Sequence, residues 1–279
     1  MKTKSIQPFL KWAGGKRQLL PSIRERIPER STISNYYEPF LGGGAVFLDL
    51  KPNRAVVNDF NEDLINAYRV IKTDVEQLIK DLEKHENTEE YYYRMRAIDR
   101  SDTYSEWTSI EKASRLIYLN KTGYNGLYRV NSKGHFNTPY GRYKNPNIVN
   151  KENLLDLNKY FNSNNIKFLT GDFEGVLRSV ESGSFVYIDP PYVPLNTTVS
   201  FTGYTNSKFG KNDQIRLKNV CDELNARNVK FLLSNSKVDF IEDLYKDYNV
   251  EIIAARRSIN SVGSKRGKID EVLISNYTL

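Results

Sequence analysis

The chain has 279 residues, of which 39% are hydrophobic, so it can bury one large core or one core with an inserted subdomain. Its longest apolar runs are only as long as strands, and no apolar segment follows the first lysines. We therefore expect a cytoplasmic protein with neither a signal peptide nor a membrane span. The single cysteine, Cys221, excludes an internal disulfide, and two distant histidines, His85 and His135, do not form a metal site.

The formal net charge is +7, and basic residues gather in three segments that contain no acid. Residues 1–24 contain six Lys and Arg residues, residues 112–151 contain eight, and residues 252–269 contain five. Charge runs commonly form solvated faces, but forty consecutive residues without Asp or Glu favour a polyanionic partner. Nucleic acid is the first candidate.

A turn at Gly14–Lys16 precedes a predicted helix that runs to about Arg26. This turn is not the phosphate loop of an ATPase, because Leu10 and Arg17 stand where that motif has Gly and Ser or Thr. The free N–H groups of a helix start, together with the lysine, would bind a small carboxylate beside Trp12. An ordinary glycine turn explains the same residues equally well.

A second glycine turn, Gly42–Gly44, leads into a predicted helix over residues 45–50 and a predicted strand over residues 55–59. Glycines let the backbone approach a ligand closely, although the spacing is not the dinucleotide motif G-x-G-x-x-G. The strand ends in Asp59, 17 residues after the first glycine, where α/β nucleotide-binding folds place a carboxylate that accepts hydrogen bonds from ribose hydroxyls. The alternative is that Asp59 caps a helix that begins at Asn61.

Residues 61–84 have apolar positions at helical spacing and predict a long helix or a helix pair. Two further helices are expected over residues 89–99 and 108–121. No βαβ pattern is found from about residue 91 to residue 165, which indicates an inserted domain.

The acid-free run inside this insert contains a hairpin pattern, because residues 126–140 alternate around the turn Asn131–Gly134. A basic β-hairpin that carries aromatic residues is suited to probing a nucleic-acid groove. An ordinary surface hairpin is the alternative, which we rank second because the basic residues here have no acidic neighbours in the sequence: Arg129, Lys133, Arg142 and Lys144.

After the insert an α/β rhythm resumes, with helices predicted over residues 213–228 and 237–247. The expected strands cover residues 166–172, 185–189, 229–235, 250–254 and 271–275. Ligands of doubly wound sheets bind at the carboxyl ends of the strands, and Asp59, Asp172 and Asp189 all lie at such ends. We expect these three acids to converge on one crevice. Cys221 falls on the apolar face of the first helix and is predicted to lie in the core.

The strand over residues 185–189 ends abruptly in Asp189-Pro190-Pro191-Tyr192. Two prolines remove two N–H donors and fix two φ angles, so the chain leaves the sheet rigidly. Asp189 and a carbonyl freed by the prolines can accept hydrogen bonds from a planar amine, while Tyr192 offers a face for a stacked base. A plain proline turn is the alternative, and the preceding buried strand favours a site.

Five ordered motifs resemble those of the Dam-type DNA adenine-N6 methyltransferases, over nearly the whole chain. The motifs are Phe9–Lys16, Glu38–Gly44, Asn58-Asp59, Gly171–Phe173 and Asp189–Tyr192. Asn125–Arg129 and Phe136–Tyr143 resemble the target-recognition hairpin of that family, particularly in GATC-methylating members such as the DpnII-system enzyme.

The resemblance implies a class I S-adenosylmethionine methyltransferase fold, which is a doubly wound, mostly parallel α/β sheet. An inserted, mainly helical DNA-recognition domain would carry the hairpin. The implied catalytic domain covers residues 1–68 and 166–279, and the implied recognition domain covers residues 69–165. The implied partner is double-stranded DNA, through which the protein would associate with the nucleoid, and a cognate restriction endonuclease is an implied genetic partner. We expect a monomer or a weak dimer. No metal is expected.

The resemblance also implies roles for single residues. Trp12 and Lys16 would lie near the methionine end of S-adenosylmethionine, Asp59 on its ribose, Asp172 on its adenine amine and Phe173 against its adenine ring. The implied cofactor-binding set is Trp12, Lys16, Gly42, Gly44, Asp59, Asp172, Phe173 and Asp189. The implied catalytic set is Asp189, Pro190, Pro191 and Tyr192. The implied DNA-binding set is Lys11, Tyr124, Asn125, Leu127, Arg129, Pro139, Arg142 and Tyr143.

The chemistry of adenine then suggests a mechanism, because the N6 lone pair is delocalised into the ring and is a poor nucleophile. Asp189 and the Pro190 carbonyl, by accepting the two N6 hydrogens, would localise that pair for attack on the methyl group. No covalent intermediate is required, and the cysteine that a cytosine-C5 enzyme needs is predicted to be buried. The base must be flipped out of the duplex, with Tyr192 stacking on it and Tyr124 filling the vacated position.

Two other classes of function use some of the same features. A methyltransferase acting on RNA or on a protein amide would share the donor fold, but the protein-glutamine enzymes resemble Asn-Pro-Pro-Tyr, whereas residue 189 is Asp. A non-catalytic DNA-binding module would not need three strand-terminal acids and a glycine loop. The basic loop over residues 256–268 suggests only a phosphate contact.

Overall fold

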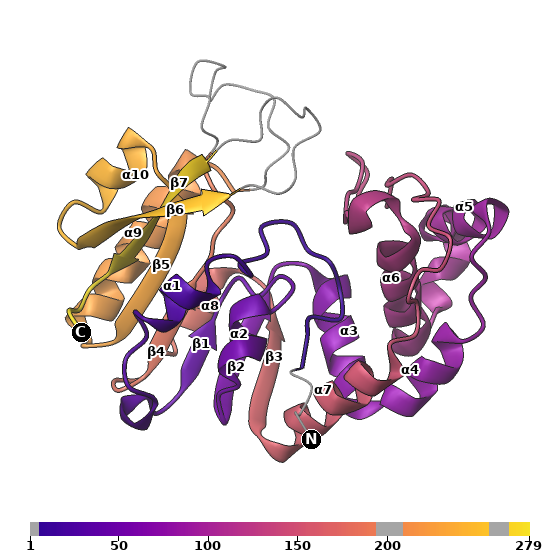
Figure 1. The fold of residues 1–279 in the computed structure, drawn as a ribbon, viewed down its shortest axis with the longest axis horizontal. Helices are drawn as coiled ribbons and strands as arrows, with labels where there is room; N and C mark the ends of the chain where they lie inside the picture. The colour runs from indigo at the N-terminus through magenta and orange to yellow at the C-terminus, as the bar shows by residue number, and fades with distance from the viewer. Residues whose placement is uncertain (1–5, 194–208, 257–267) are drawn as a thin grey trace. The chain divides into compact units, whose positions relative to one another are not determined.

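The computed structural model describes residues 6–193, 209–256 and 268–279 (Figure 1). Its contacts divide the chain into two compact units. The first unit comprises Met1–Gly15, Leu41–Asn53 and Asp59–Gly171, and the second comprises Lys16–Phe40, Arg54–Asn58 and Asp172–Leu279. The expected boundary between a catalytic and a recognition domain stays a prediction.

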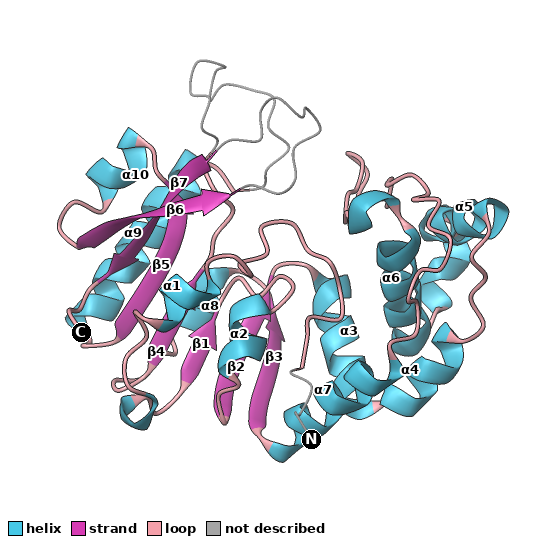
Figure 2. Cartoon of the chain, in the orientation of Figure 1, coloured by secondary structure: helices cyan, strands magenta, loops and turns pink. Residues whose placement is uncertain are grey.

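Seven strands form one sheet in the order β3-β2-β1-β4-β5-β7-β6 (Figure 2). The strands are β1 (Tyr36–Glu38), β2 (Arg54–Asp59), β3 (Asn165–Thr170), β4 (Phe185–Ile188), β5 (Lys230–Ser236), β6 (Asn249–Arg256) and β7 (Lys268–Ser275). β1 pairs in parallel with β2 and β4, and β4 in parallel with β5, whereas β7 runs antiparallel to β5 and β6. The predicted α/β class with a mostly parallel sheet is confirmed.

In the second unit every residue of β4 is buried, as expected for a strand of a parallel sheet that is covered on both faces. The helices of this unit are α1 (Leu20–Arg24), α8 (Phe173–Leu177), α9 (Lys211–Ala226) and α10 (Asp239–Leu244), with a 3₁₀ turn at Arg30–Thr32. Cys221 of α9 is fully buried in the core with Leu217, Val220 and Leu224, as predicted. Burial raises the pKa of its thiol to about 12, so it remains an unreactive thiol.

The predicted helix after the first glycine turn is wrong at its start. α1 begins only at Leu20 and ends at Arg24, and the backbone N–H of Leu19 instead closes a turn on the Lys16 carbonyl at 2.9 Å. Pro21 is the cause, because its fixed φ suits the first turn of a helix and its ring clashes with an earlier helical turn. The glycines therefore do not open a helix, and the expected carboxylate site at a helix start is absent there.

In the first unit the helices are α2 (Ala45–Leu50), α3 (Glu62–Thr73), α4 (Val75–Leu82), α5 (Glu89–Ala97), α6 (Ser109–Thr122) and α7 (Lys151–Ser163). Short 3₁₀ turns follow at Ile98–Arg100, Asp102–Glu106 and Tyr124–Gly126. The run over residues 61–84 is thus a helix pair. Thr108 and Glu111 form a reciprocal capping box at the start of α6, which fixes where that helix begins.

The predicted hairpin folds back at the expected turn but does not form regular strands. The N–H of Gly134 bonds the Asn131 carbonyl at 2.9 Å, and Val130 bridges Phe136 in the antiparallel sense. A second isolated bridge joins Gly123 and Tyr140. Phe136 and Tyr140 pack on the aromatic cluster of α5 and α6, so side chains rather than a continuous ladder hold these two arms.

Within the three described ranges, no helix combines the length and the apolar composition needed to cross a membrane. Over the same residues, His, Cys, Asp and Glu side chains do not gather in groups of three that could hold a metal ion. The greater part of the basic loop over residues 256–268 lies outside the described residues.

Candidate active site

Asp189 follows the last residue of β4 and lies at the carboxyl end of the parallel strands of the second unit. Two groups contact its Oδ1 atom: the Lys16 ammonium at 2.8 Å and the Ser234 hydroxyl at 2.9 Å. The parallel register explains the second contact, because Ile188 is paired with Leu233 and the next residue on each strand is Asp189 and Ser234. Within the part of the chain that the structure describes, both partners of this carboxylate therefore bind the same oxygen.

The Asp189–Lys16 pair is largely shielded from water, since the side chains are 18% and 7% exposed. Burial raises the pKa of the Asp189 carboxyl, while Lys16 and then Ser234 lower it again by stabilising the anion. The Lys16 ammonium also lies 4.4 Å from the centre of the Tyr192 ring, a cation–π contact. The sequence predicted that Lys16 binds the carboxylate of a small ligand. In the structure Lys16 binds a carboxylate of the protein itself, that of Asp189.

The Pro-Pro-Tyr segment after Asp189 is held by buried polar side chains. Gln214 of α9 donates to the Pro191 carbonyl at 2.9 Å, and the Ser236 hydroxyl donates to the Val193 carbonyl at 2.6 Å. The Tyr192 hydroxyl donates to Glu271 of β7 at 2.7 Å. These contacts fix both the path of the chain and the orientation of the tyrosine ring.

Sequence reasoning missed these supporting residues, although one signal was present. Ser234, Asn235 and Ser236 are three consecutive polar residues at the end of an otherwise apolar strand, and all three are fully buried. Buried polar groups require partners, so such a run predicts a polar network at that strand end. Asn235 completes this network through a bond from its amide to Gln214 at 3.2 Å.

Asp172 and Phe173, also in the second unit, lie at the start of α8. Asp172 caps this helix by accepting from the N–H of Glu174 at 3.0 Å, and it forms a short ion pair with Arg216 of α9. The Arg216 guanidinium also contacts Glu174 at 2.8 Å and lies 4.7 Å from the centre of the Phe173 ring. Phe173 is buried against Phe40 and Phe209.

In the first unit Asp59 ends β2 and ties two loops together. Its Oδ2 accepts from the N–H of Gly42 at 2.8 Å, and its Oδ1 accepts from the N–H of Asn61 at 2.9 Å. The alternative role of Asp59 as a helix cap is wrong, because Asn61 caps α3 by accepting from the N–H of Leu64 at 3.0 Å. Burial raises the pKa of the Asp59 carboxyl, and the backbone N–H groups lower it in part.

The glycines of the second turn are required by close packing. Gly42 has φ +50°, and a Cβ atom there would lie 2.9 Å from the Trp12 indole. Gly44 has φ +67°, and a Cβ atom would lie 2.7 Å from the Tyr68 hydroxyl. Because most side chains resist positive φ and would collide here, the turn holds its backbone N–H groups beside Asp59 and Trp12 only with glycine.

Trp12 stacks on Tyr128, with ring centres 5.1 Å apart and planes inclined by 27°. Burial raises the pKa of Tyr128 to about 12, so it remains a neutral phenol at neutral pH. Tyr128 belongs to the segment that resembles a recognition hairpin. Within the first unit this stack therefore joins the expected donor-binding tryptophan to the expected recognition segment.

Several predicted DNA-binding residues gather on the exposed part of this segment. Tyr124 is 53% exposed, and Asn125 next to it has φ +55° and donates its N–H to the Tyr143 hydroxyl at 3.0 Å. The Lys11 ammonium lies 5.4 Å from the Tyr143 ring. Leu127 is half-buried and Pro139 is exposed. Lys11, Tyr124, Asn125 and Tyr143 thus form one patch.

The two predicted recognition arginines differ in their contacts. The Arg129 guanidinium donates to the Asn137 side chain at 2.7 Å through Nε and to the Asn137 carbonyl at 3.2 Å through Nη2. Arg142 lies 3.5 Å from Glu89 in an exposed ion pair, so it has an acidic neighbour in space that the sequence does not reveal. Exposed pairs of this kind contribute little and open readily.

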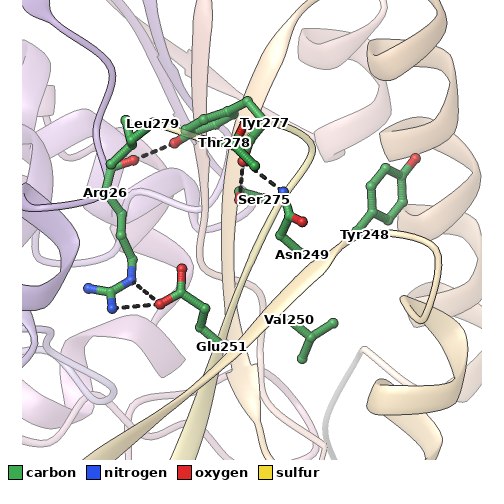
Figure 3. Close-up of a pocket in the computed structure, with 9 residues that line it drawn as sticks. All are labelled: Arg26, Tyr248, Asn249, Val250, Glu251, Ser275, Tyr277, Thr278 and Leu279. Atoms are coloured by element: carbon green, nitrogen blue, oxygen red, sulfur yellow. Dashed lines mark hydrogen bonds and ion pairs between the residues drawn. The ribbon is translucent and has the colours of Figure 1, made fainter.

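A pocket of about 500 Å³ lies elsewhere in the second unit (Figure 3). Arg26 and Glu251 form an ion pair at 2.7 Å on its wall, and Ser275 and Tyr277 of the chain end complete it. None of its nine lining residues belongs to a predicted site.

The predicted site residues are thus divided between the units. Trp12, Gly42, Gly44, Asp59 and the whole DNA-binding set lie in the first unit, and Lys16, Asp172, Phe173 and the catalytic tetrad lie in the second. Asp59 ends β2 and Asp189 directly follows β4, as predicted, whereas β3 ends two residues before Asp172, which caps α8. Their convergence on one crevice stays a prediction.

The family model and three relatives that match this chain are all methyltransferases. Residues 12–259 match the family described as D12 class N6 adenine-specific DNA methyltransferase. The chain is 47% identical over 275 residues to Type II methyltransferase M1.LlaDCHI of Lactococcus lactis subsp. cremoris, a match that covers 98% of this chain and 96% of the relative. It is 45% identical to Type II methyltransferase M.MjaIII of Methanocaldococcus jannaschii, with 98% and 99% covered.

A third relative, the DNA adenine methylase of Escherichia coli strain K12, is 33% identical over 274 residues, with 97% of this chain and 95% of the relative covered. These matches span the glycine turns, the insert and the Asp-Pro-Pro-Tyr segment alike. The chain belongs to the D12 class of N6 adenine-specific DNA methyltransferases.

Proposed function

We propose that this enzyme transfers a methyl group from S-adenosylmethionine to N6 of adenine within GATC in duplex DNA, after flipping the base out of the helix. The observation that carries the proposal is the contact pattern of Asp189. Both of its recorded partners in the described residues lie on Oδ1, which leaves Oδ2 to accept a hydrogen bond from an exocyclic amine.

The residues of both units suit the donor. Asp59 accepts two backbone N–H bonds, and its remaining lone pairs can accept from ribose hydroxyls. Asp172 caps a helix and stands next to an aromatic ring, a pairing suited to an adenine amine and its ring face. When bound, S-adenosylmethionine supplies an electrophilic methyl group on a sulfonium. We also assign a role in donor binding to Trp12, Gly42 and Gly44 of the first unit and to Lys16 and Phe173 of the second unit.

The tetrad Asp189–Tyr192 binds and activates the adenine that accepts the methyl group. Oδ2 of Asp189 and the Pro190 carbonyl accept the two N6 hydrogens and so localise the nitrogen lone pair, in bonds that strengthen towards the transition state. The Pro191 carbonyl is already bonded to Gln214, which supports Pro190 as the second acceptor. Tyr192, oriented by Glu271, stacks on the flipped base, and the exposed ring of Tyr124 fills its place in the duplex.

GATC as the target rests on the recognition-like segment around Arg129 and Tyr143. The test is to compare initial methylation rates on a GATC duplex and on duplexes with one base pair changed. Base flipping is tested by replacing the target adenine with 2-aminopurine, whose fluorescence rises when it is unstacked. Equal rates on all duplexes would refute the GATC assignment, and constant fluorescence would refute flipping. The names of two relatives as Type II methyltransferases support a restriction endonuclease as a genetic partner.

Arg129→Ala should lower activity on GATC far more than on a duplex already altered at a guanine-containing pair. The Asn137 contacts orient the guanidinium and leave its Nη1 edge for guanine O6 and N7, a pair that contributes about 1–3 kcal/mol of discrimination. Methylation rates of both proteins on both duplexes measure this. Lys133→Ala removes an equal charge from the same segment and is the control. Equal loss on every duplex would make Arg129 a phosphate contact.

Duplex affinity should fall steeply as salt rises. Each phosphate that a Lys or Arg neutralises releases counterions and adds about −0.9 to the slope of log affinity against log salt concentration. The net charge of +7 and the acid-free segments predict several such contacts. Fluorescence anisotropy of a labelled duplex at increasing salt gives the slope. A flat response would count against duplex DNA as the substrate.

A further inference from the structure

We propose that Ser234 is a positioning residue that fixes the orientation and the ionisation of the Asp189 carboxylate, and that Tyr187 sets the direction of this hydrogen bond. The inference deepens the proposed function and rests on it, because Asp189 is the proposed acceptor of the N6 hydrogens. It concerns residues of the second unit alone.

The geometry forms a chain of three groups across β4 and β5. The Tyr187 hydroxyl lies 3.2 Å from the Ser234 hydroxyl, and the Ser234 hydroxyl lies 2.9 Å from Oδ1 of Asp189. Tyr187 and Ser234 are fully buried, so water does not compete for these bonds. The parallel register pairs Tyr187 with Leu232 and Ile188 with Leu233, so Ser234 lies beside Asp189. Tyr187 and Asp189 are two residues apart along the chain and therefore lie on the same face of the sheet.

The direction of the chain follows from proton count. A serine hydroxyl has one proton, and an ionised carboxylate can only accept. Burial raises the pKa of the Tyr187 phenol well above its usual value, so Tyr187 keeps its proton and its O–H donates a hydrogen bond to the Ser234 oxygen. The single proton of Ser234 is then directed to Oδ1. Lys16 binds the same oxygen, and the two donors together turn Oδ2 towards the substrate side.

Other charged or titratable groups around Asp189 must be considered in any pH test. Lys16 faces it from the loop before α1, Tyr187 from β4, Tyr192 from the segment after β4, and Glu271 faces Tyr192 from β7. Removing the Ser234 hydroxyl leaves the charges of Lys16 and Glu271 in place, but it also takes away the hydrogen-bond partner of Tyr187. A change in the titration of Asp189 that is larger in Ser234→Ala than in Tyr187→Phe therefore reports the lost hydrogen bond between Ser234 and Asp189.

Ser234→Ala should raise the pKa of Asp189, because the anion loses a donor. Since the carboxylate must be ionised to accept N6 hydrogens, the acid limb of kcat/KM should move to higher pH, by about one unit. At neutral pH kcat should fall about tenfold while the KM for the donor stays unchanged. Tyr187→Phe should shift the same limb in the same direction by less, and Ser234→Thr, which keeps the hydroxyl, should restore it.

Ser236→Ala is the matched control. It removes a hydroxyl that is equally buried and lies two residues along the same strand, but this hydroxyl bonds the Val193 carbonyl and not a carboxylate. Its acid limb should remain that of the wild type, whatever happens to its rate. Coincident limbs for Ser234→Ala and Ser236→Ala would overturn the inference while leaving the proposed function intact.

Titration of the Asp189 carboxyl by carbon-13 NMR separates the two claims. A higher pKa in Ser234→Ala than in the wild type supports the positioning role even if no methyl group reached N6, in which case the proposed function alone would fail. Identical Asp189 titrations in the two proteins would overturn the inference, and they would do so even if Ser234→Ala failed to support catalysis.

Discussion

Asp189→Ala should reduce methyl transfer to adenine by about a hundredfold to a thousandfold while leaving duplex affinity nearly unchanged. The carboxylate is proposed to act on N6 and not on phosphate, and losing a group that stabilises the transition state typically costs about 10²–10³ in kcat from a single donor. Steady-state methylation rates and duplex anisotropy, measured on the same preparation, provide the comparison.

The variant also removes the ion pair between Lys16 and Asp189 at a position that is largely shielded from water, which destabilises the fold. Asp189→Asn keeps the shape of the side chain and should be almost as inactive, because an amide oxygen has no charge to localise the lone pair. Asp222→Asn removes an exposed carboxylate that pairs with Lys218 and serves as the control. Substantial activity in Asp189→Ala, with a folded protein, would contradict the mechanism.

Asp59→Ala should weaken binding of S-adenosylmethionine by about tenfold to a hundredfold, since hydrogen bonds to a charged group contribute about 1.5–3 kcal/mol. Duplex affinity in the absence of donor should stay the same, because a ribose ligand touches only the donor. Isothermal titration calorimetry with the donor, beside anisotropy with the duplex, measures both.

Asp59 has a structural task as well, because it accepts from the N–H groups of Gly42 and Asn61. Thermal unfolding of Asp59→Ala must therefore be measured beside its donor affinity. Asp59→Asn can still accept one of these bonds and should recover part of the stability but little of the affinity. Glu62→Gln changes an exposed acid nearby and should alter neither. Unchanged donor affinity in a folded Asp59→Ala protein would remove this residue from the donor site.

The fold was predictable wherever local patterns dominate. The apolar run before Asp189 became β4, the residues after Gly44 became α2 with the predicted bounds, and Cys221 lies in the core. These features depend on periodicity, on proline and on glycine, all of which act within a few residues. The start of α1 was mispredicted because Pro21 belongs in the first turn of a helix, so the helix begins at Leu20 and not at the glycines.

The parts of the site that could not be predicted from the sequence depend on contacts between residues far apart in the chain. Lys16 and Asp189 are brought together only by the sheet, and Ser234 meets Asp189 only because β4 and β5 are parallel and in register. The N-cap of α3 could not be assigned from the sequence either, although it involves only neighbouring residues. Asp59 and Asn61 are both good capping residues, and only the backbone geometry assigns the cap to Asn61.

Nucleoside analysis after reaction with isotopically labelled S-adenosylmethionine tests the central claim most directly. A duplex containing one GATC site is incubated with the purified protein, digested to nucleosides and analysed by mass spectrometry. The proposed mechanism predicts that the label appears as N6-methyladenine at the adenine of GATC, and that Asp189→Ala gives at most a trace of it in the same time. Label on another atom or another base, or no transfer to duplex DNA, would contradict it.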